Sequence, residues 1–509
     1  MTSSPWRGPG LGPATTFLAA WNSLAVLVFL GPRLRASAAA LVGIAAAFDV
    51  AAAATVGAGT VWSRRVGSRA ALASGSAVFA LASAGCALVS APPVLVAARA
   101  VQGIAAALMV AAAFEALSGP PGPAGLGLGS SPDVGGGFQT GGLQTGAFQT
   151  GVFQTGGVGA ALVCGPLLAG AAATVNGWRW VFWGDAIAGV AVCVVVLVRG
   201  SRAASPASVP APAADSSDCA PTDRARQPRD LFDLLGLALI TVAVAGPVAA
   251  LDEATSAGWG NIRTLALLAA GLLALVPILV WQTPLGALYG RAFVAAQVAD
   301  LCLLAATAGT LFLLVQYFHV VAGSGPLGVG LRIVPWSAAV AVVLPVSASV
   351  DVGARGMRRL IAAGMALDAI GLLGLATVVR GRQTGWWLAL SLVVSGAGVG
   401  LAMPAARRAA VTVAGLRQPE GVVGGLGAVR WAGAALGIAL LGAVLVARGG
   451  LGPGTSAPAS ASGSVGRGAA PAVATAALLA AVGAAAALTL PARERPPMAP
   501  VSSRPHPGE

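Results

Sequence analysis

Five polar side chains stand inside long apolar stretches of this chain, where an ionisable or amide group is unusual. They are the carboxylates Asp49, Asp300 and Asp368, together with Arg99 and Gln102, which lie three residues apart. A charge at the depth of a lipid bilayer is costly, and such groups commonly mark ion pathways or proton relays. We therefore predict that these five residues move protons or a solute, with Asp49 as the preferred partner of Arg99. The alternative is that they only tie neighbouring helices together.

The composition is that of a polytopic membrane protein. Of the 509 residues, 57% are hydrophobic and only 9% are charged, whereas soluble proteins average about 25% charged residues. The net charge of +13 comes from thirty arginines scattered between apolar runs. Because they form no basic stripe and no nucleic-acid motif, a nucleic-acid partner is not expected. The five cysteines form no C-x-x-C pair, and we predict neither a metal site nor any cofactor.

Fourteen apolar runs are long enough to cross a bilayer, since about 20 apolar residues span the hydrocarbon core as a helix. We therefore predict an all-α fold with about fourteen transmembrane helices. The runs cover residues 14–33, 37–61, 70–90, 93–117, 156–176, 179–198, 232–251, 263–281, 292–317, 326–349, 358–380, 386–412, 421–447 and 471–490.

The runs divide into two six-helix halves and an extra pair. A Gly-rich insertion at 118–155 ends in four FQTG-type repeats, which we interpret as a flexible cytoplasmic loop because stacked repeats need more neighbours to bury a core. The predicted parts are a tail (1–13), the N-terminal half (14–198), a linker (199–230), two extra helices (231–281), five helices of the C-terminal half (282–447), a loop (448–470), the last helix (471–490) and a tail (491–509).

Arginine placement sets the expected orientation. With the N-terminus inside, twenty arginines, Arg407 and Arg430 among them, fall on the cytoplasmic side, nine fall outside, and Arg99 lies within a span. Arginine and lysine are enriched on the cytoplasmic side of membrane proteins. We therefore predict that both termini are cytoplasmic and that the protein lies in the plasma membrane.

Two short motifs resemble those of the major facilitator superfamily. Arg99-x-x-Gln102 followed by glycine resembles a motif of that superfamily's fourth helix, whose arginine is implicated in proton-coupled transport. Gly165, Pro166 and Gly170 resemble its antiporter signature, which is associated with export. Small residues allow tight helix crossing and proline bends a helix.

The segment from Gly59 to Arg69 resembles the superfamily's loop between helices two and three. Arg65, Gly67 and Arg69 fit that pattern, but Arg64 stands where the family has an aspartate that is thought to latch a cytoplasmic gate. The resemblance implies that these five residues form a gating loop. The alternative is that the arginines serve only as a topology signal.

The order and spacing of these motifs resemble the fourteen-span drug–proton antiporters of multidrug or antibiotic efflux type. The resemblance implies a major facilitator fold, in which substrate binds near the midplane and rocking of the two halves alternates access. It also implies proton-driven export of a hydrophobic or cationic small molecule. The implied partners are that substrate, protons and the lipid bilayer, and we expect a monomer.

Three other interpretations stay open. One is a solute facilitator of the same fold without proton coupling. Another is a transport-inactive membrane sensor or scaffold, favoured by the missing loop aspartate and by the insertion. The third, a membrane enzyme, is not favoured because no His/Cys/acid cluster or nucleophile motif is present.

Overall fold

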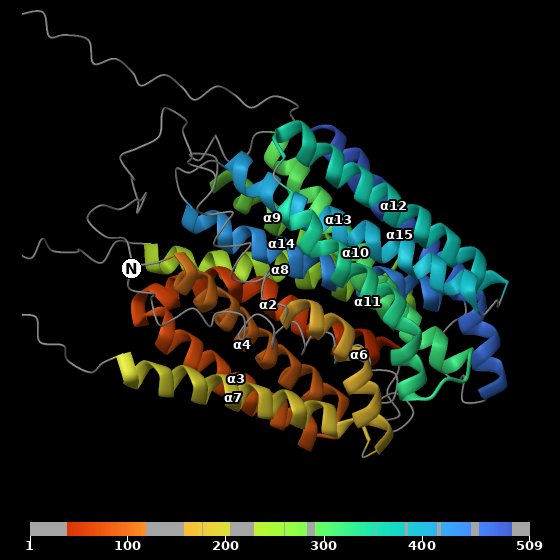
Figure 1. Ribbon diagram of the computed structural model, residues 1–509, viewed down its shortest axis with the longest axis horizontal. Coiled ribbons are helices and arrows are strands. Elements are labelled where there is room, and N and C mark those ends of the chain that lie inside the picture. The colour runs from red at the N-terminus through yellow and green to blue at the C-terminus, as the bar shows by residue number, and fades with distance from the viewer. Residues whose placement is uncertain are drawn as a thin grey trace, which may run out of the picture.

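The computed structural model is a bundle of long helices that run side by side (Figure 1). It describes residues 38–118, 157–175, 177–203, 229–258, 260–281, 291–350, 352–381, 385–414, 419–448 and 458–490. Every regular element within those ranges is a helix. The helices are α2 (Ala38–Val66), α3 (Ser68–Leu88), α4 (Pro92–Ser118), α6 (Gly157–Val175), α7 (Arg179–Ala203), α8 (Arg229–Ala257), α9 (Ile262–Trp281), α10 (Arg291–Val320), α11 (Pro326–Ser349), α12 (Ala354–Arg380), α13 (Trp386–Ala414), α14 (Pro419–Ala447) and α15 (Pro458–Leu488).

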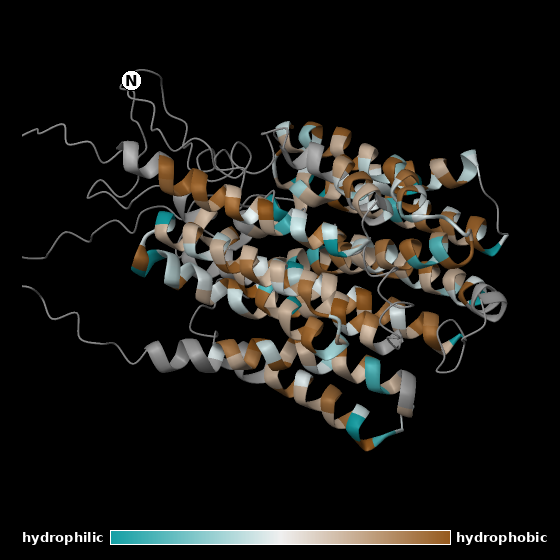
Figure 2. Ribbon diagram, turned by 90° about the horizontal axis from the view of Figure 1, so that it is seen from below, coloured by the Kyte–Doolittle hydropathy of each residue, from teal (hydrophilic) through white to brown (hydrophobic). Residues whose placement is uncertain are grey.

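Apolar residues cover most of the length of these helices (Figure 2). Eleven helices in the described part of the chain are long and apolar enough to cross a membrane. Large apolar side chains also point outward; Leu81, Ile187 and Val342 are 74%, 65% and 67% exposed. Lipid solvates such side chains, and a helix satisfies its own backbone hydrogen bonds there. The predicted all-helical membrane fold is confirmed, while the count of fourteen stays a prediction because span 14–33 lies outside the described residues.

The helices form two halves with the same internal packing. In the N-terminal half α4 packs against α2 and α3, and α3 packs against α7. In the C-terminal half α13 packs against α11 and α12, and α12 packs against α15. The halves meet along two seams, α2 against α14 and α6 against α11.

The predicted antiporter-type helix is α6, and it forms one of these seams. Gly165, Pro166 and Gly170 are all buried there. A Cβ atom at Gly170 would lie 2.7 Å from the carbonyl oxygen of Pro326, and one at Gly330 would overlap the carbonyl of Pro166. The two backbones therefore touch, which only small residues at the crossing allow.

The two extra helices flank the other seam. Helix α8 packs against α2 and α14, and α9 packs against α8. Figure 1 shows α8 running alongside α2 and α14. The predicted extra pair thus lies beside the contact between the halves instead of forming a separate unit.

The last helix begins earlier than predicted. Its apolar run starts near residue 471, but the helix begins at Pro458 because its polar first turns continue into side chains buried against the C-terminal half, such as Val465 and Ala469. Residues 1–13, 119–155, 204–228 and 491–509, which contain the predicted tails, insertion and linker core, lie outside the described residues.

Candidate functional site

Arg99 lies within α4 and is held by a chain of hydrogen bonds. Its side chain is 1% exposed. Its Nη1 donates to Oε1 of Gln102, whose Nε2 donates to Oγ of Ser83 at 2.8 Å. Ser83 in turn donates to the carbonyl of Phe79 at 2.7 Å. Because both ends of the Gln102 amide are engaged, the guanidinium of Arg99 has a fixed orientation.

Two carboxylates and an aromatic ring surround this guanidinium. Its central carbon lies 4.6 Å from the ring centroid of Phe48 on α2. Asp49, on the same helix, and Asp185, on α7, lie within electrostatic range of Arg99 and are 7% and 4% exposed. In the described part of the chain no carboxylate forms an ion pair with Arg99, whose buried Nε makes no hydrogen bond. Arg99 and its predicted partner Asp49 therefore interact electrostatically without forming an ion pair.

A close helix crossing creates this arrangement. A Cβ atom at Gly103 would overlap the carbonyl group of Phe48, so the backbones of α2 and α4 are in contact there. Arg99 lies one turn before Gly103, which brings its guanidinium to the Phe48 ring. Buried alanines follow on α4 and let the two helices continue together: Ala105, Ala106 and Ala107.

A second charged cluster lies in the C-terminal half. Asp300 on α10 is 1% exposed, and its Oδ2 lies 4.0 Å from Nε of Arg430 on α14. Arg407 on α13 is within electrostatic range of both. Oδ1 of Asp300 and Nη1 of Arg430 are buried without a hydrogen bond to any described residue. This cluster therefore has two guanidinium groups for one carboxylate.

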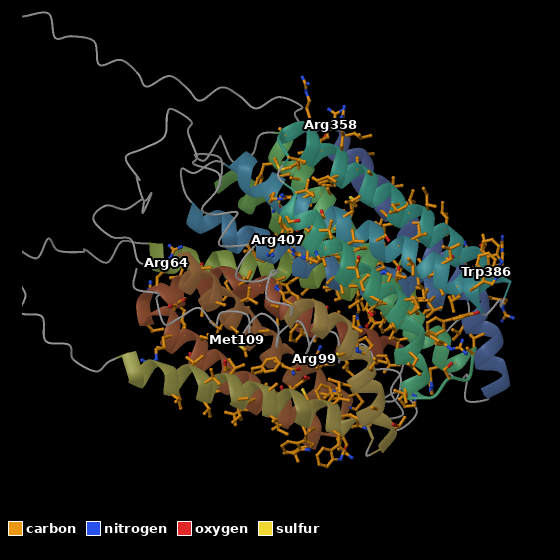
Figure 3. The ribbon with its side chains drawn as sticks, in the orientation of Figure 1. Arg64, Arg99, Met109, Arg358, Trp386 and Arg407 are labelled. Atoms are coloured by element: carbon orange, nitrogen blue, oxygen red, sulfur yellow. The ribbon has the colours of Figure 1, made fainter. Side chains whose placement is uncertain are left out.

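The sequence alone does not predict these two arginines as neighbours of Asp300. Both arginines are predicted from the sequence to lie towards the cytoplasmic side, and they lie within α13 and α14. Figure 3 labels Arg407, whose side chain is partly buried. The sequence does mark Arg430 as unusual, because this arginine interrupts the apolar run 421–447 in the same way that Arg99 interrupts its own run.

Asp368 forms a third buried group. It lies on α12, is 1% exposed, and its Oδ1 accepts a hydrogen bond from Ser395 at 2.6 Å. The indole of Trp336 on α11 donates to the same Ser395 hydroxyl at 3.3 Å. The five predicted residues therefore fall into three clusters, each with its own neighbours. Among the described residues, no three His, Cys, Asp or Glu side chains gather as a metal site requires.

The predicted gating loop is mostly helix. Gly59, Arg64 and Arg65 lie in α2, which continues to Val66, because basic side chains in a last turn interact favourably with the helix dipole. Gly59 faces α4, where an added Cβ would lie 3.1 Å from Cβ of Ala111. The change of direction falls on Gly67, whose φ of 86° suits glycine.

Arg69 begins the next helix and connects it to α7. Its Nη2 donates to the carbonyl of Leu197 at 2.8 Å. Arg64 and Arg65 are exposed. The gating role of this segment stays a prediction, since the helix geometry accounts for all of these positions.

The fold resembles that of solved membrane transporters. A POT family transporter in complex with 5-aminolevulinic acid matches with a TM-score of 0.60 and 14% identity, over 94% of this chain and 95% of that one. The human organic anion transporter MFSD10 matches with a TM-score of 0.57 and 12% identity, over 96% and 100%. The chain therefore has the major facilitator fold.

Curated relatives point to a narrower group. The chain is 29% identical over 291 residues to the multidrug resistance protein Stp of Mycobacterium tuberculosis, and 27% identical over 303 residues to the tetracenomycin C resistance and export protein of Streptomyces glaucescens. These matches cover 56% and 57% of this chain and 50% and 51% of the relatives. The chain thus spans about half the length of the curated relatives it matches, and no family model matches it. The predicted resemblance to drug and antibiotic exporters is confirmed.

Proposed function

We propose that this protein exports a hydrophobic or cationic small molecule in exchange for protons, by alternating access. The observation that carries the proposal is the fully buried Arg99, held by Gln102 and within electrostatic range of two buried carboxylates. A buried charge that only joined helices would be costly at this depth. The names of the curated relatives, which refer to multidrug resistance and to resistance and export of tetracenomycin C, support export of a small molecule as the proposed direction.

Counting formal charges suggests how a proton acts at this site. Arg99 carries one positive charge, while Asp49 and Asp185 together carry two negative charges when ionised. Among these three side chains, one proton therefore brings the formal charge to zero. Loading that proton on Asp49 removes a net charge from the low-dielectric interior, and releasing it restores the charge. The protonated and deprotonated states of Asp49 therefore favour different packing of the two halves along the α2/α14 and α6/α11 seams. A change from one packing to the other is the motion that alternating access requires.

Transport by the purified protein in vesicles tests this proposal. We expect export of at least one compound of a hydrophobic and cationic panel to depend on an imposed proton gradient and to stop on adding an uncoupler. Asp49→Asn and Arg99→Gln should each abolish gradient-driven export while leaving substrate binding intact. If the two residues act as one unit, the double change should cost little more than either alone. Additive losses would contradict the pairing.

Two other outcomes would select other functions. Flux that is insensitive to the uncoupler would identify a facilitator without proton coupling. The absence of flux for the whole panel would favour a transport-inactive sensor, for which the exposed Arg64 in place of an acidic latch is the supporting observation.

We also infer a monomer in the plasma membrane with both termini in the cytoplasm. Figure 3 shows Arg64 and Arg358 towards one end of the bundle and Trp386 at the other. Arginines cluster on the cytoplasmic side of membrane proteins. In a variant whose only cysteine is Cys219, which lies outside the described residues, an impermeant thiol reagent added to intact cells should fail to label the protein. Labelling from outside would reverse the orientation.

A further inference from the structure

We propose that Trp431 on α14 is a positioning residue that transmits the state of the Arg99 cluster to the Asp300 cluster in the other half. This inference rests on the proposed function, because it assigns the coupling step of that function to one side chain. It concerns the α2/α14 seam, where the two halves meet.

The first support is a continuous stack of side chains across the seam. The ring centroids of Trp431 and Phe48 are 5.5 Å apart, with their planes at 73°, an edge-to-face contact. The same Phe48 ring lies 4.6 Å from the guanidinium carbon of Arg99. Helices α4, α2 and α14 are thus joined by three side chains in sequence, and the first of them is the buried charge.

The second support is where the Trp431 side chain packs. It belongs to the C-terminal half, yet it contacts an apolar cluster of the N-terminal half formed by Ala52, Val56 and Ala107. It also contacts the N-terminal cluster that contains Phe48. The partly buried indole therefore packs against the core of the opposite half. A shift of α14 along α2 must move it or displace the residues around it, because packed cores do not deform smoothly.

The third support is the residue that precedes it. Arg430 lies 4.0 Å from Asp300 through Nε, and it also feels the charge of Arg407. Adjacent residues of one helix thus hold an indole in the N-terminal half and a guanidinium at the C-terminal charged cluster. A change in the proton occupancy of Asp49 alters the field at Arg99 and the position of its guanidinium on Phe48. Phe48 then moves Trp431, and α14 carries the displacement to Arg430.

Vesicles that report substrate flux and proton flux together test this step. Trp431→Leu should lower the amount of substrate moved per proton by about tenfold or more, within the range of coupling between two sites, while substrate binding persists. Trp431→Phe, which keeps an aromatic edge, should recover most of the ratio. Trp386→Leu is the matched control, because Trp386 is 63% exposed at the far end of the bundle, and it should leave the ratio unchanged. An unchanged ratio in Trp431→Leu would overturn the proposal.

A stability measurement tests it without transport. We expect the Tm shifts of Arg99→Gln and Arg430→Gln to be non-additive in the otherwise unaltered protein and additive once Trp431→Leu is present. Additive shifts in the first background, or equal non-additivity in both, would overturn the inference. If Trp431→Leu does not accumulate, Trp431→Met takes its place. If the unaltered protein transports no compound, the proposed function fails. The additivity of the Tm shifts still tests whether Trp431 links the two clusters.

Discussion

The α2/α4 crossing in the N-terminal half and the α11/α13 crossing in the C-terminal half share one backbone geometry. At the first, Gly103 lies against the carbonyl of Phe48; at the second, Gly396 lies against the carbonyl of Trp336. In each case a glycine accepts the backbone of a neighbouring helix at an aromatic residue. The two crossings also occupy the same place in the packing of their halves.

Their side chains differ in charge. One turn before the glycine stands Arg99 in the N-terminal half and Leu392 in the C-terminal half, and both are 1% exposed. The residue after the aromatic is Asp49 in one and Ser337 in the other, and the Ser337 hydroxyl donates to the carbonyl of Val334 on its own helix. Both crossings thus bring a glycine against the backbone of an aromatic residue, and the C-terminal crossing forms without charged side chains at the two equivalent positions.

The C-terminal half places its charged cluster on other helices, α10, α13 and α14, and with a different ratio of arginines to acids. Arg407 and Arg430 face one carboxylate, Asp300, whereas Arg99 faces two, Asp49 and Asp185. Removing one acid should thus have unequal consequences in the two halves, and four predictions compare the halves in charge and in packing.

Asp300→Asn should have the largest effect on stability. It removes the carboxylate that pairs with Arg430, and breaking a buried pair costs about 3–5 kcal/mol. Asp49→Asn should cost much less, because Asp185 still balances Arg99. The amount of folded protein in membranes and the Tm of the purified protein measure both changes. Equal losses would break the proposed asymmetry of charge.

Arg99→Leu copies the C-terminal crossing into the N-terminal half. Leucine occupies the equivalent position at Leu392, but the change removes the positive charge that faces Asp49 and Asp185. We therefore expect a lower Tm together with a loss of gradient-driven export of about a hundredfold, near the upper end of coupling between sites. Flux assays in vesicles at matched protein level give the number. Full export by this variant would reduce Arg99 to a packing residue.

Gly103→Ala and Gly396→Ala test whether the crossings are equivalent in packing. Each new methyl group would meet a backbone carbonyl, and such overpacking costs about 1–3 kcal/mol. Gly85→Ala is the control, since a Cβ there meets nothing within 4 Å. Thermal unfolding measures all three. A large cost at one crossing and none at the other would contradict the shared geometry.

Gly67→Ala should have the smallest effect. Gly67 turns the chain between α2 and α3 with a φ of 86°, which costs other residues about 1–2 kcal/mol. The matching turn between α11 and α12 uses Gly353 with a φ of −64°, so Gly353→Ala should be tolerated. A comparison of Tm values decides. If both changes were equally harmful, backbone conformation would not distinguish the two turns.

The sequence by itself determined that this is a helical membrane protein and which side chains are unusual in it. Hydropathy and the cost of a charge in lipid are local properties, so Arg99, Asp300 and Asp368 could be singled out by reading one segment at a time. The small residues around Gly103 and Gly170 could be recognised as helix contacts for the same reason.

Only the tertiary structure decided which groups meet. Asp300 and Arg430 are far apart in the chain, and nothing in either segment specifies the other. Likewise, Ser83 and Asp185 reach the Arg99 cluster because α3 packs beside α4 and α7 packs beside α3, and Trp431 contacts Phe48 from the opposite half. Partners of this kind depend on helix rotation and register, which are fixed by the packing of the whole bundle and not by the apolar pattern of any one span.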